Sequence, residues 1–187
     1  MGNDRDVRYR VPNVNQCKEC HAAEDKITPI GPKARNLNKK FVFNEGEFNQ
    51  LTYWMNRQII DDYPLELVSP VDWTDDSQNI NDRVRSYLDV NCGHCHSPTG
   101  NANSTGLYLH LDETRDIHLG LYKKPVATGR GSGGLKYSIV PGKPDESILL
   151  HRMISLDPGV MMPESGRALS HTEAVEMVRE WILVMED

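Results

Sequence analysis

The four cysteines of the chain fall into two copies of one short pattern, C-x-x-C-H, at residues 17–21 (CKECH) and 92–96 (CGHCH). Two thiols three positions apart lie on one side of a helical turn, where both can add to the vinyl groups of a haem. The histidine directly after the second cysteine is then placed beneath the iron as its proximal ligand. Because the two copies use all four cysteines, the pattern predicts two covalently attached haem c groups.

Six side chains would bind these two haems. Four supply thioether sulfurs and two supply proximal iron ligands: Cys17, Cys20, Cys92 and Cys95, and His21 and His96. The alternative for the same residues is a structural zinc site or a redox dithiol. Zinc ribbons usually separate their C-x-x-C knuckles by roughly 15–20 residues, whereas the two copies here begin 75 positions apart (92 − 17). This long separation, and the histidine after each knuckle, favour haem.

The sixth iron ligand of the second haem is predicted from a methionine beside a proline. Met162 directly precedes Pro163, in a loop between two expected helices and 66 positions after His96 (162 − 96). This order is typical of the distal ligand of a cytochrome c, because the proline removes a backbone donor and stiffens the loop that carries the sulfur. Its neighbour Met161 is the alternative ligand.

The sixth ligand of the first haem has several candidates. Met55 lies on the apolar face of an expected helix, and a thioether is a common ligand in electron-transfer cytochromes. Methionine on such a face is more often part of a core, however. An open iron is also compatible with the sequence, and four further candidates lie in the second half of the chain: Met153, Met161, His110 and His118.

Composition and charge narrow the class of protein. A chain of 187 residues, 38% of them hydrophobic, can form one domain or two small ones. Its net charge of −6 argues against nucleic acid as a partner and suits docking on a partner protein that presents basic residues around the partner's own redox centre. No apolar run approaches the roughly 20 residues that span a bilayer.

The N-terminus is too polar for a secretory signal. Because haem c is attached outside the bacterial inner membrane, we expect a periplasmic protein whose signal peptide is absent from this chain.

The fold is expected to be mainly α, with long loops and two packed haem modules, at residues 1–78 and 79–187. The first module is abbreviated, because a proline keeps residues 8–16 extended and no helix precedes its haem motif. Residues 22–26 should continue the helical turn of the motif. A further helix is expected over 47–60, with its apolar residues on one face.

The second module is expected to resemble a class I cytochrome c. The spacing of Val84, Tyr87 and Leu88 predicts a helix over 82–91 that runs into the second motif. A short strand or an extended segment is expected over 106–111, and a short helix over 144–153. The last helix should begin with a capping box formed by Ser170 and Glu173 and bury an apolar stripe made of Val175, Val178, Trp181 and Ile182. The last three of these should pack across Tyr87 and Leu88.

Two loops could support the haems. Residues 28–38 are similar to the loop after the haem motif of cytochromes c, in which a proline carbonyl, here of Pro29 or Pro32, accepts the proton on the far nitrogen of the haem histidine. An ordinary turn is the alternative. The glycine-rich stretch 123–134 lacks the order of a phosphate-binding loop. It is expected either to pack near a porphyrin, with Arg130 at a propionate, or to be a plain surface loop.

Taken together, these stretches resemble a family of bacterial di-haem c-type cytochromes, and the resemblance covers nearly the whole chain. In the second module it rests on residues 91–96, 125–134, 139–144, 147–149, 152–153 and 157–164; in the first it rests on 11–13, 15–17, 29–32 and 49–51. Members resemble periplasmic electron carriers. The resemblance implies His21 and His96 as proximal ligands and Met162 as a distal one, and it identifies no partner protein.

Three functions are compatible with these expectations. The leading hypothesis is a di-haem cytochrome that carries single electrons between partner proteins and is not an enzyme. The alternative is a di-haem peroxidase-type enzyme, in which the first haem keeps an open position beside an acid or base. A gas or redox sensor is the third, although no segment of the sequence resembles an output domain.

Overall fold

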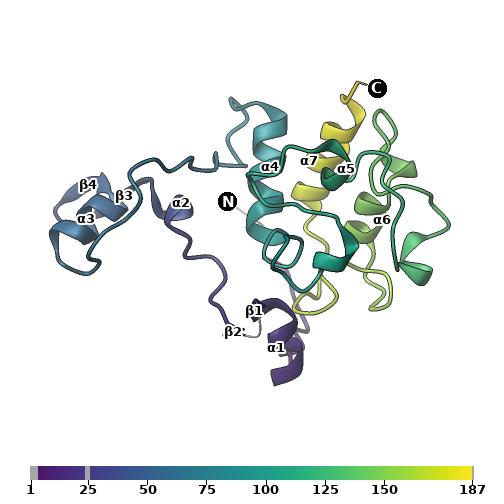
Figure 1. Cartoon of the computed structure of the whole chain (residues 1–187), viewed down its shortest axis with the longest axis horizontal. Helices are drawn as coiled ribbons and strands as arrows, with labels where there is room; N and C mark the ends of the chain where they lie inside the picture. The colour runs from purple at the N-terminus through teal and green to yellow at the C-terminus, as the bar shows by residue number, and fades with distance from the viewer. Residues whose placement is uncertain (1–3, 24–25, 187) are drawn as a thin grey trace.

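The computed structural model describes residues 4–23 and 26–186, and this part of the chain is mainly α-helical (Figure 1). Its helices are α1 (Val14–His21), α2 (Ala34–Leu37), α3 (Gln50–Asn56), α4 (Ile80–Asn91), α5 (Asp116–Leu119), α6 (Ile148–Ile154) and α7 (Thr172–Leu183). Short 3-10 turns are η1 (Asn103–Thr105), η2 (Gly129–Ser132) and η3 (Pro144–Glu146). Two antiparallel hairpins pair β1 (Ala22–Ala23) with β2 (Lys26–Ile27) and β3 (Lys40–Phe43) with β4 (Gly46–Asn49).

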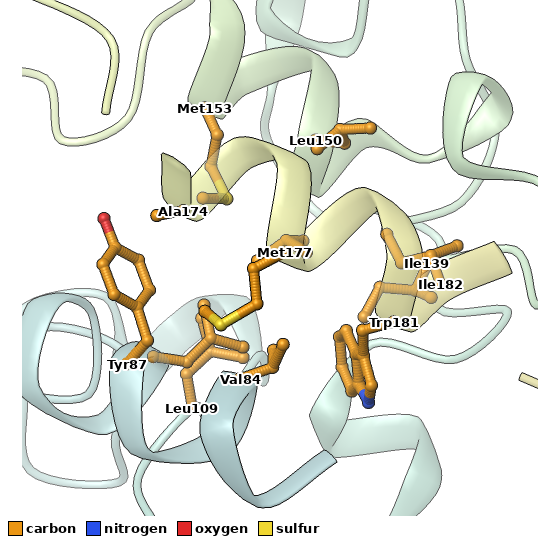
Figure 2. Packing of buried hydrophobic residues seen from close by; sticks show 12 residues of the cluster. Val84, Tyr87, Leu109, Ile139, Leu150, Met153, Ala174, Met177, Trp181 and Ile182 are labelled. Carbon is orange, nitrogen blue, oxygen red and sulfur yellow. The ribbon is translucent and has the colours of Figure 1, made fainter. Parts of the chain in front are cut away.

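The core lies where α4 and α7 pack against each other (Figure 2). Helix α4 begins after Asn79, whose side chain caps it by accepting a hydrogen bond from the Asn81 amide at 2.8 Å. One cluster of buried side chains joins the two helices to α6 and to residues 109 and 139: Val84, Tyr87, Leu88, Leu109, Ile139, Leu150, Met153, Ala174, Met177, Val178, Trp181 and Ile182. The predicted helix over 82–91 and its packing against the last helix are confirmed. Burial of each large apolar side chain in this cluster contributes roughly 1.5–3 kcal/mol.

The first C-x-x-C-H motif lies inside α1. The Gln16 amide donates to the Asn13 side chain at 3.0 Å, and the Asn13 amide donates to the Gln16 side chain at 3.1 Å. This reciprocal capping box starts the helix at Val14, two residues before the end of the segment that was expected to be extended. Residues 4–13 are in neither helix nor strand.

The expected helical continuation after His21 is wrong. Residues 22–23 pair with 26–27 as the hairpin β1–β2, and residues 24 and 25 lie outside the described part. The Thr28 amide donates to the His21 carbonyl at 2.6 Å, which closes the hairpin directly onto the end of α1.

The expected helix over 47–60 is also wrong in its first part. Residues 46–49 pair with 40–43 as β3–β4, and α3 covers only residues 50–56. Gly46, with φ of +130°, permits the tight turn that forms this hairpin. The ring of Phe43 then stacks on Tyr53 of α3, with centroids 3.7 Å apart. Strand pairing and aromatic stacking therefore outweigh the helical pattern that the sequence suggested.

The last helix begins one residue later than expected. Helix α7 starts at Thr172, and the predicted capping box is wrong because the Ser170 hydroxyl donates to the Met153 carbonyl at 3.2 Å. Glu173 instead forms an ion pair with Arg5 at 2.6 Å. The expected short helix over 144–153 is present as η3 followed by α6, and residues 106–111 form no described strand.

The first module has almost no core of its own. Among the residues described before Val84, only Leu51 is buried. The hairpin β3–β4 and α3 form a lobe that stands apart from the α4–α7 body (Figure 1), and Phe41, Val42 and Ile59 of this region are exposed. Within residues 4–23 and 26–186, no helix is long and apolar enough to cross a membrane.

Candidate cofactor site

The two C-x-x-C-H motifs lie side by side. The sulfurs of Cys20 and Cys95 and a ring nitrogen of His94 all lie within 4.8 Å of one another. The Asn101 side chain secures this contact by donating to the carbonyls of Lys18 and Glu19, at 3.0 and 2.6 Å. The end of α1 is thereby fixed against the turn that follows α4. All four cysteines of the chain are free thiols.

The four thiols have very different surroundings. Hydrogen bonds from Cys95 and His94 lower the pKa of Cys20 to about 4. The Cys20 sulfur raises the pKa of Cys95 well above its ordinary value, because only one of two adjacent thiols ionises readily. Burial alone raises the pKa of Cys92 to about 12, whereas Cys17 is exposed. Each motif therefore contributes one cysteine to the contact and keeps one away from it.

The two predicted proximal histidines differ in exposure. His21 is exposed, and its Nδ1 lies 3.3 Å from the carbonyl of Thr28. An Nδ1 that donates to a carbonyl fixes the ring and leaves Nε2 available to a metal. The expected partner carbonyl was that of Pro29 or Pro32, but the hairpin places the carbonyl of the preceding residue, Thr28, at the ring.

His96 lies mostly inside the second module. Burial lowers its pKa and the backbone carbonyl of Leu107 opposes this effect, although Nδ1 makes no hydrogen bond of ordinary geometry. The His96 carbonyl accepts a hydrogen bond from the Leu109 amide at 2.8 Å. Residues 107–109 therefore run beside this histidine and fix its position.

A hollow of about 320 Å³ opens between the two motifs. Residues of the first motif and its following loop line one side, including Cys20, Ile30 and Arg35. Residues of the second module line the other, including His94 and His110. Desolvation lowers the pKa of His110, which favours its neutral imidazole.

The loop that carries Met162 is fastened by backbone contacts. The Arg152 guanidinium donates to the Val160 carbonyl at 2.8 Å, and the Met162 amide donates to the Arg152 carbonyl at 3.0 Å. Met161 is buried, with 8% of its surface exposed, whereas Met162 is half-buried. The loop thus presents two adjacent methionines in different environments, and the assignment of Met162 as the distal ligand stays a prediction.

The other predicted ligands lie at several places in the fold. Met55 lies in α3, within the lobe that stands apart from α1 (Figure 1). Met153 is buried in the α4–α7 cluster. The Nδ1 of His118 lies 3.9 Å from Glu113. Arg130 forms an exposed ion pair with Asp157 at 2.7 Å, and the glycine-rich turn η2 packs on α6. None of these four side chains is among the residues that line the hollow.

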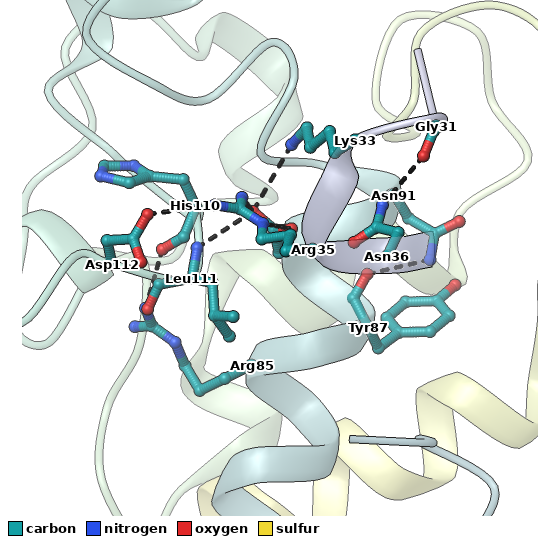
Figure 3. Close-up of polar contacts among 11 residues, drawn as sticks. Gly31, Lys33, Arg35, Asn36, Arg85, Tyr87, Asn91, His110, Leu111 and Asp112 are labelled. Carbon is teal, nitrogen blue, oxygen red and sulfur yellow. Dashed lines mark hydrogen bonds and ion pairs between the residues drawn. The ribbon is translucent and has the colours of Figure 1, made fainter. Parts of the chain in front are cut away.

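A buried ion pair behind the hollow escaped the sequence analysis. Asp89, three residues before Cys92, has a fully buried side chain and accepts hydrogen bonds from Arg35 of α2 and from the Leu111 amide at 3.0 Å. Lys33 lies 3.6 Å from the same carboxylate. Figure 3 shows how these contacts join α2 to α4 and to residues 110–112. No sequence pattern signals this pairing, because the partners are 54 positions apart.

His94 also escaped, since it occupies a variable position of the C-x-x-C-H pattern. Its position in the structure beside Cys20 depends on a contact between segments far apart in the chain. The sequence signal that could have identified His94 as a candidate ligand is its position between the two cysteines of the motif.

The chain was compared with protein-family models, with curated proteins and with solved structures, and no match was found. The resemblance described above therefore stays an interpretation of the motifs.

Replacing Arg35 with alanine should destabilise the protein by roughly 3–5 kcal/mol, because it leaves the buried Asp89 carboxylate without its closest cation. The free energy of unfolding in urea measures this. The matched control is Arg57→Ala, which removes an ion pair between the exposed residues Arg57 and Glu45 and should change the stability little. Equal effects of the two substitutions would contradict a structural role for Arg35.

In the chain produced without haem, alkylation of Cys20 should depend weakly on pH between pH 5 and pH 8. Its pKa of about 4 means that the reactive thiolate is already formed above that pH. Cys92, with a pKa of about 12, should react slowly and faster with each increase in pH. Iodoacetamide labelling followed by peptide mass spectrometry measures both rates. A tenfold rise per pH unit at Cys20 would contradict its lowered pKa.

Proposed function

We propose that the chain is a di-haem c-type cytochrome that carries single electrons between redox partner proteins in the periplasm. The observation that carries the proposal is the pair of C-x-x-C-H motifs, whose four sulfurs are free and which lie side by side. Each motif holds two thiols and a histidine, the set that haem c attachment requires.

The surroundings of the first motif fit a haem. The Nδ1 of His21 faces the Thr28 carbonyl, which would leave Nε2 for iron. Val11, Val14 and Ile27 flank the motif and are 77%, 71% and 77% exposed. A porphyrin bound here would cover part of this apolar surface, which otherwise costs free energy in water. A haem would thus supply the core that the first module lacks.

The residues of the chain would bind, orient and shield the two groups. Cys17 and Cys20, and Cys92 and Cys95, would form the thioether bonds. His21 and His96 would be the proximal ligands, with Met162 as the distal ligand of the second haem. Haem iron supplies reversible one-electron chemistry, and the ligand set and the burial around it set the potential.

The contact between the motifs favours electron carriage. Because the Cys20 and Cys95 sulfurs lie within 4.8 Å of each other, the chain would bring its two attachment sites next to one another. Electrons could then enter at one site and leave at the other without a large movement of the protein. The net charge of −6 would steer the chain toward partners with basic surfaces.

The sixth ligand of the first haem is less determined. A role for Met55 would require the lobe that contains α3 to approach α1. His110 lines the hollow between the motifs and is the candidate already close to both. An imidazole beside an open iron would instead suit the peroxidase-type alternative, in which His110 would act as the base. Addition of peroxide or carbon monoxide to the reduced protein distinguishes the two, since six-coordinate irons should give no spectral change.

The exported chain, produced with a cytochrome c maturation system, should carry two covalent haems. Intact-mass spectrometry and a haem stain of the denatured protein count them. The double variant Cys17→Ser/Cys20→Ser should carry one, because it loses only the first pair of thioether sulfurs. A mass equal to that of the amino acids alone, or colour that separates from the polypeptide in acid acetone, would refute the proposal.

The second haem should lose its thioether ligand when Met162 is replaced with alanine. The oxidised protein should then lose the weak absorption band at the red edge of the visible spectrum that reports an iron–methionine bond. Met161→Ala is the matched control and should keep the band. If the band were lost in Met161→Ala and kept in Met162→Ala, Met161 would be the distal ligand of the second haem. A second band that disappears in Met55→Ala would identify Met55 as the distal ligand of the first haem.

A further inference from the structure

We propose that Cys20, His94 and Cys95 bind one zinc-class cation in the chain before haem is attached. The site belongs to the unmodified protein and does not depend on the proposed function. It differs from a zinc ribbon, which would use both cysteines of each motif. Here one cysteine comes from each motif, and the third ligand is the histidine at a variable position of the second.

The ligand atoms are already gathered. Two sulfurs and a ring nitrogen lie within 4.8 Å of one another. In a tetrahedral zinc site, bonds of about 2.3 Å to sulfur and about 2.0 Å to nitrogen place neighbouring ligand atoms about 3.3–3.8 Å apart. A shift of about 1 Å would therefore close the set around an ion. Two sulfurs and an imidazole are ligands that zinc prefers over hard-ligand cations such as calcium.

Backbone contacts fix the positions of His94 and Cys95, the two ligands that the second motif supplies. The Ala102 amide donates to the Cys95 carbonyl at 3.0 Å. A side chain at Gly100 would lie 2.3 Å from the same carbonyl and 2.6 Å from that of His94, so the loop after the motif packs tightly on both ligands. On the other side, Asn101 binds the carbonyls of Lys18 and Glu19 and fixes the end of α1, where Cys20 lies. The loop that follows the second motif thus aligns all three ligands.

The His94 side chain has an unused polar atom. Its Nδ1 is buried and forms no hydrogen bond, which is unfavourable for a polar atom, and the ring lies beside the Cys20 sulfur. The hollow of about 320 Å³ adjoins both Cys20 and His94. It provides an entry path and room for a water molecule as the fourth ligand, as in zinc sites with three protein ligands.

Cysteine binds a metal ion as the thiolate, so binding of a divalent cation would release to solvent the thiol protons that Cys20 and Cys95 still carry. The Cys95 sulfur, which donates to the Glu19 carbonyl at 3.5 Å, would exchange that hydrogen bond for the ion. The bound ion would then occupy one sulfur of each motif. Metal binding and thioether formation are therefore mutually exclusive at Cys20 and Cys95, and the ion must leave before either motif can complete its attachment.

The test uses the full chain produced without haem maturation, stripped of metal and kept reduced with a phosphine. Titration with Co²⁺ should give one equivalent per chain, with sulfur-to-metal charge-transfer absorption. Zn²⁺ should displace the Co²⁺. Cys20→Ser, Cys95→Ser and His94→Ala should each weaken binding at least tenfold, because loss of an outer hydrogen bond to a ligand already costs about 10–100-fold.

The matched controls are Cys17→Ser and Cys92→Ser, the same substitution at the other cysteine of each motif. Both should retain binding, and circular dichroism should show the helices of every variant. If Cys17→Ser or Cys92→Ser lost Co²⁺ binding as strongly as Cys20→Ser, the ion would be bound by four cysteines and the proposed ligand set would be wrong. Unchanged binding in His94→Ala would show that the histidine is not a ligand. Absence of a one-equivalent endpoint in the wild-type titration would refute the site.

His94→Ala also separates this site from the proposed function. His94 is in neither the thioether set nor the proximal set, so the exported variant should still receive two haems while the unmodified variant loses the metal site. Absence of haem from the exported wild-type protein would refute the cytochrome proposal. It would not affect the metal site, which the one-equivalent endpoint of the Co²⁺ titration tests separately.

Discussion

The buried carboxylate of Asp89 is the contact on which the arrangement of the two motifs depends. It lies on α4, three residues before the second motif, and binds Arg35 from the segment that follows the first. A buried carboxylate requires a cation and hydrogen bonds, and here Arg35, Lys33 and the Leu111 amide provide them. This requirement, together with the bonds from Asn101 to the end of α1, draws a segment with almost no core onto the well-packed α4–α7 body.

The contact between the motifs would give the same sulfurs two uses. Under the proposed function Cys20 and Cys95 would each be half of a thioether pair, and together with His94 they form a compact group that could hold a metal ion. A thiolate at Cys20 can attack a vinyl group or coordinate a metal ion, but it cannot do both. Haem attachment and metal binding would therefore compete, because whichever of the two reaches the sulfur first excludes the other.

The first module shows why a covalent cofactor would matter to this fold. The part of the chain that the structure describes before α4 (residues 4–23 and 26–79) forms a helix of eight residues, two small hairpins and two short helices, and only Leu51 within it is buried. Such elements bury too little apolar surface to offset the entropy of ordering the chain. The first module therefore depends on contacts with the second and, under the proposed function, on a porphyrin placed against Val14 and Ile27.

The sequence by itself determined the helices α4 and α7 and their packing, because these follow from a 3.6-residue apolar period; the haem chemistry of the two motifs follows from the residue types and their spacing and stays a prediction. It did not determine the hairpin β3–β4, where pairing of residues 40–43 with 46–49 outweighs a helical pattern, nor the Thr28 carbonyl at His21. Only the tertiary structure decided that Arg35 meets Asp89 and that Cys20 meets His94 and Cys95. These partners are distant in the chain. A periodic sequence pattern cannot predict such contacts, because they are stabilised by burial and charge only after the two segments have come together.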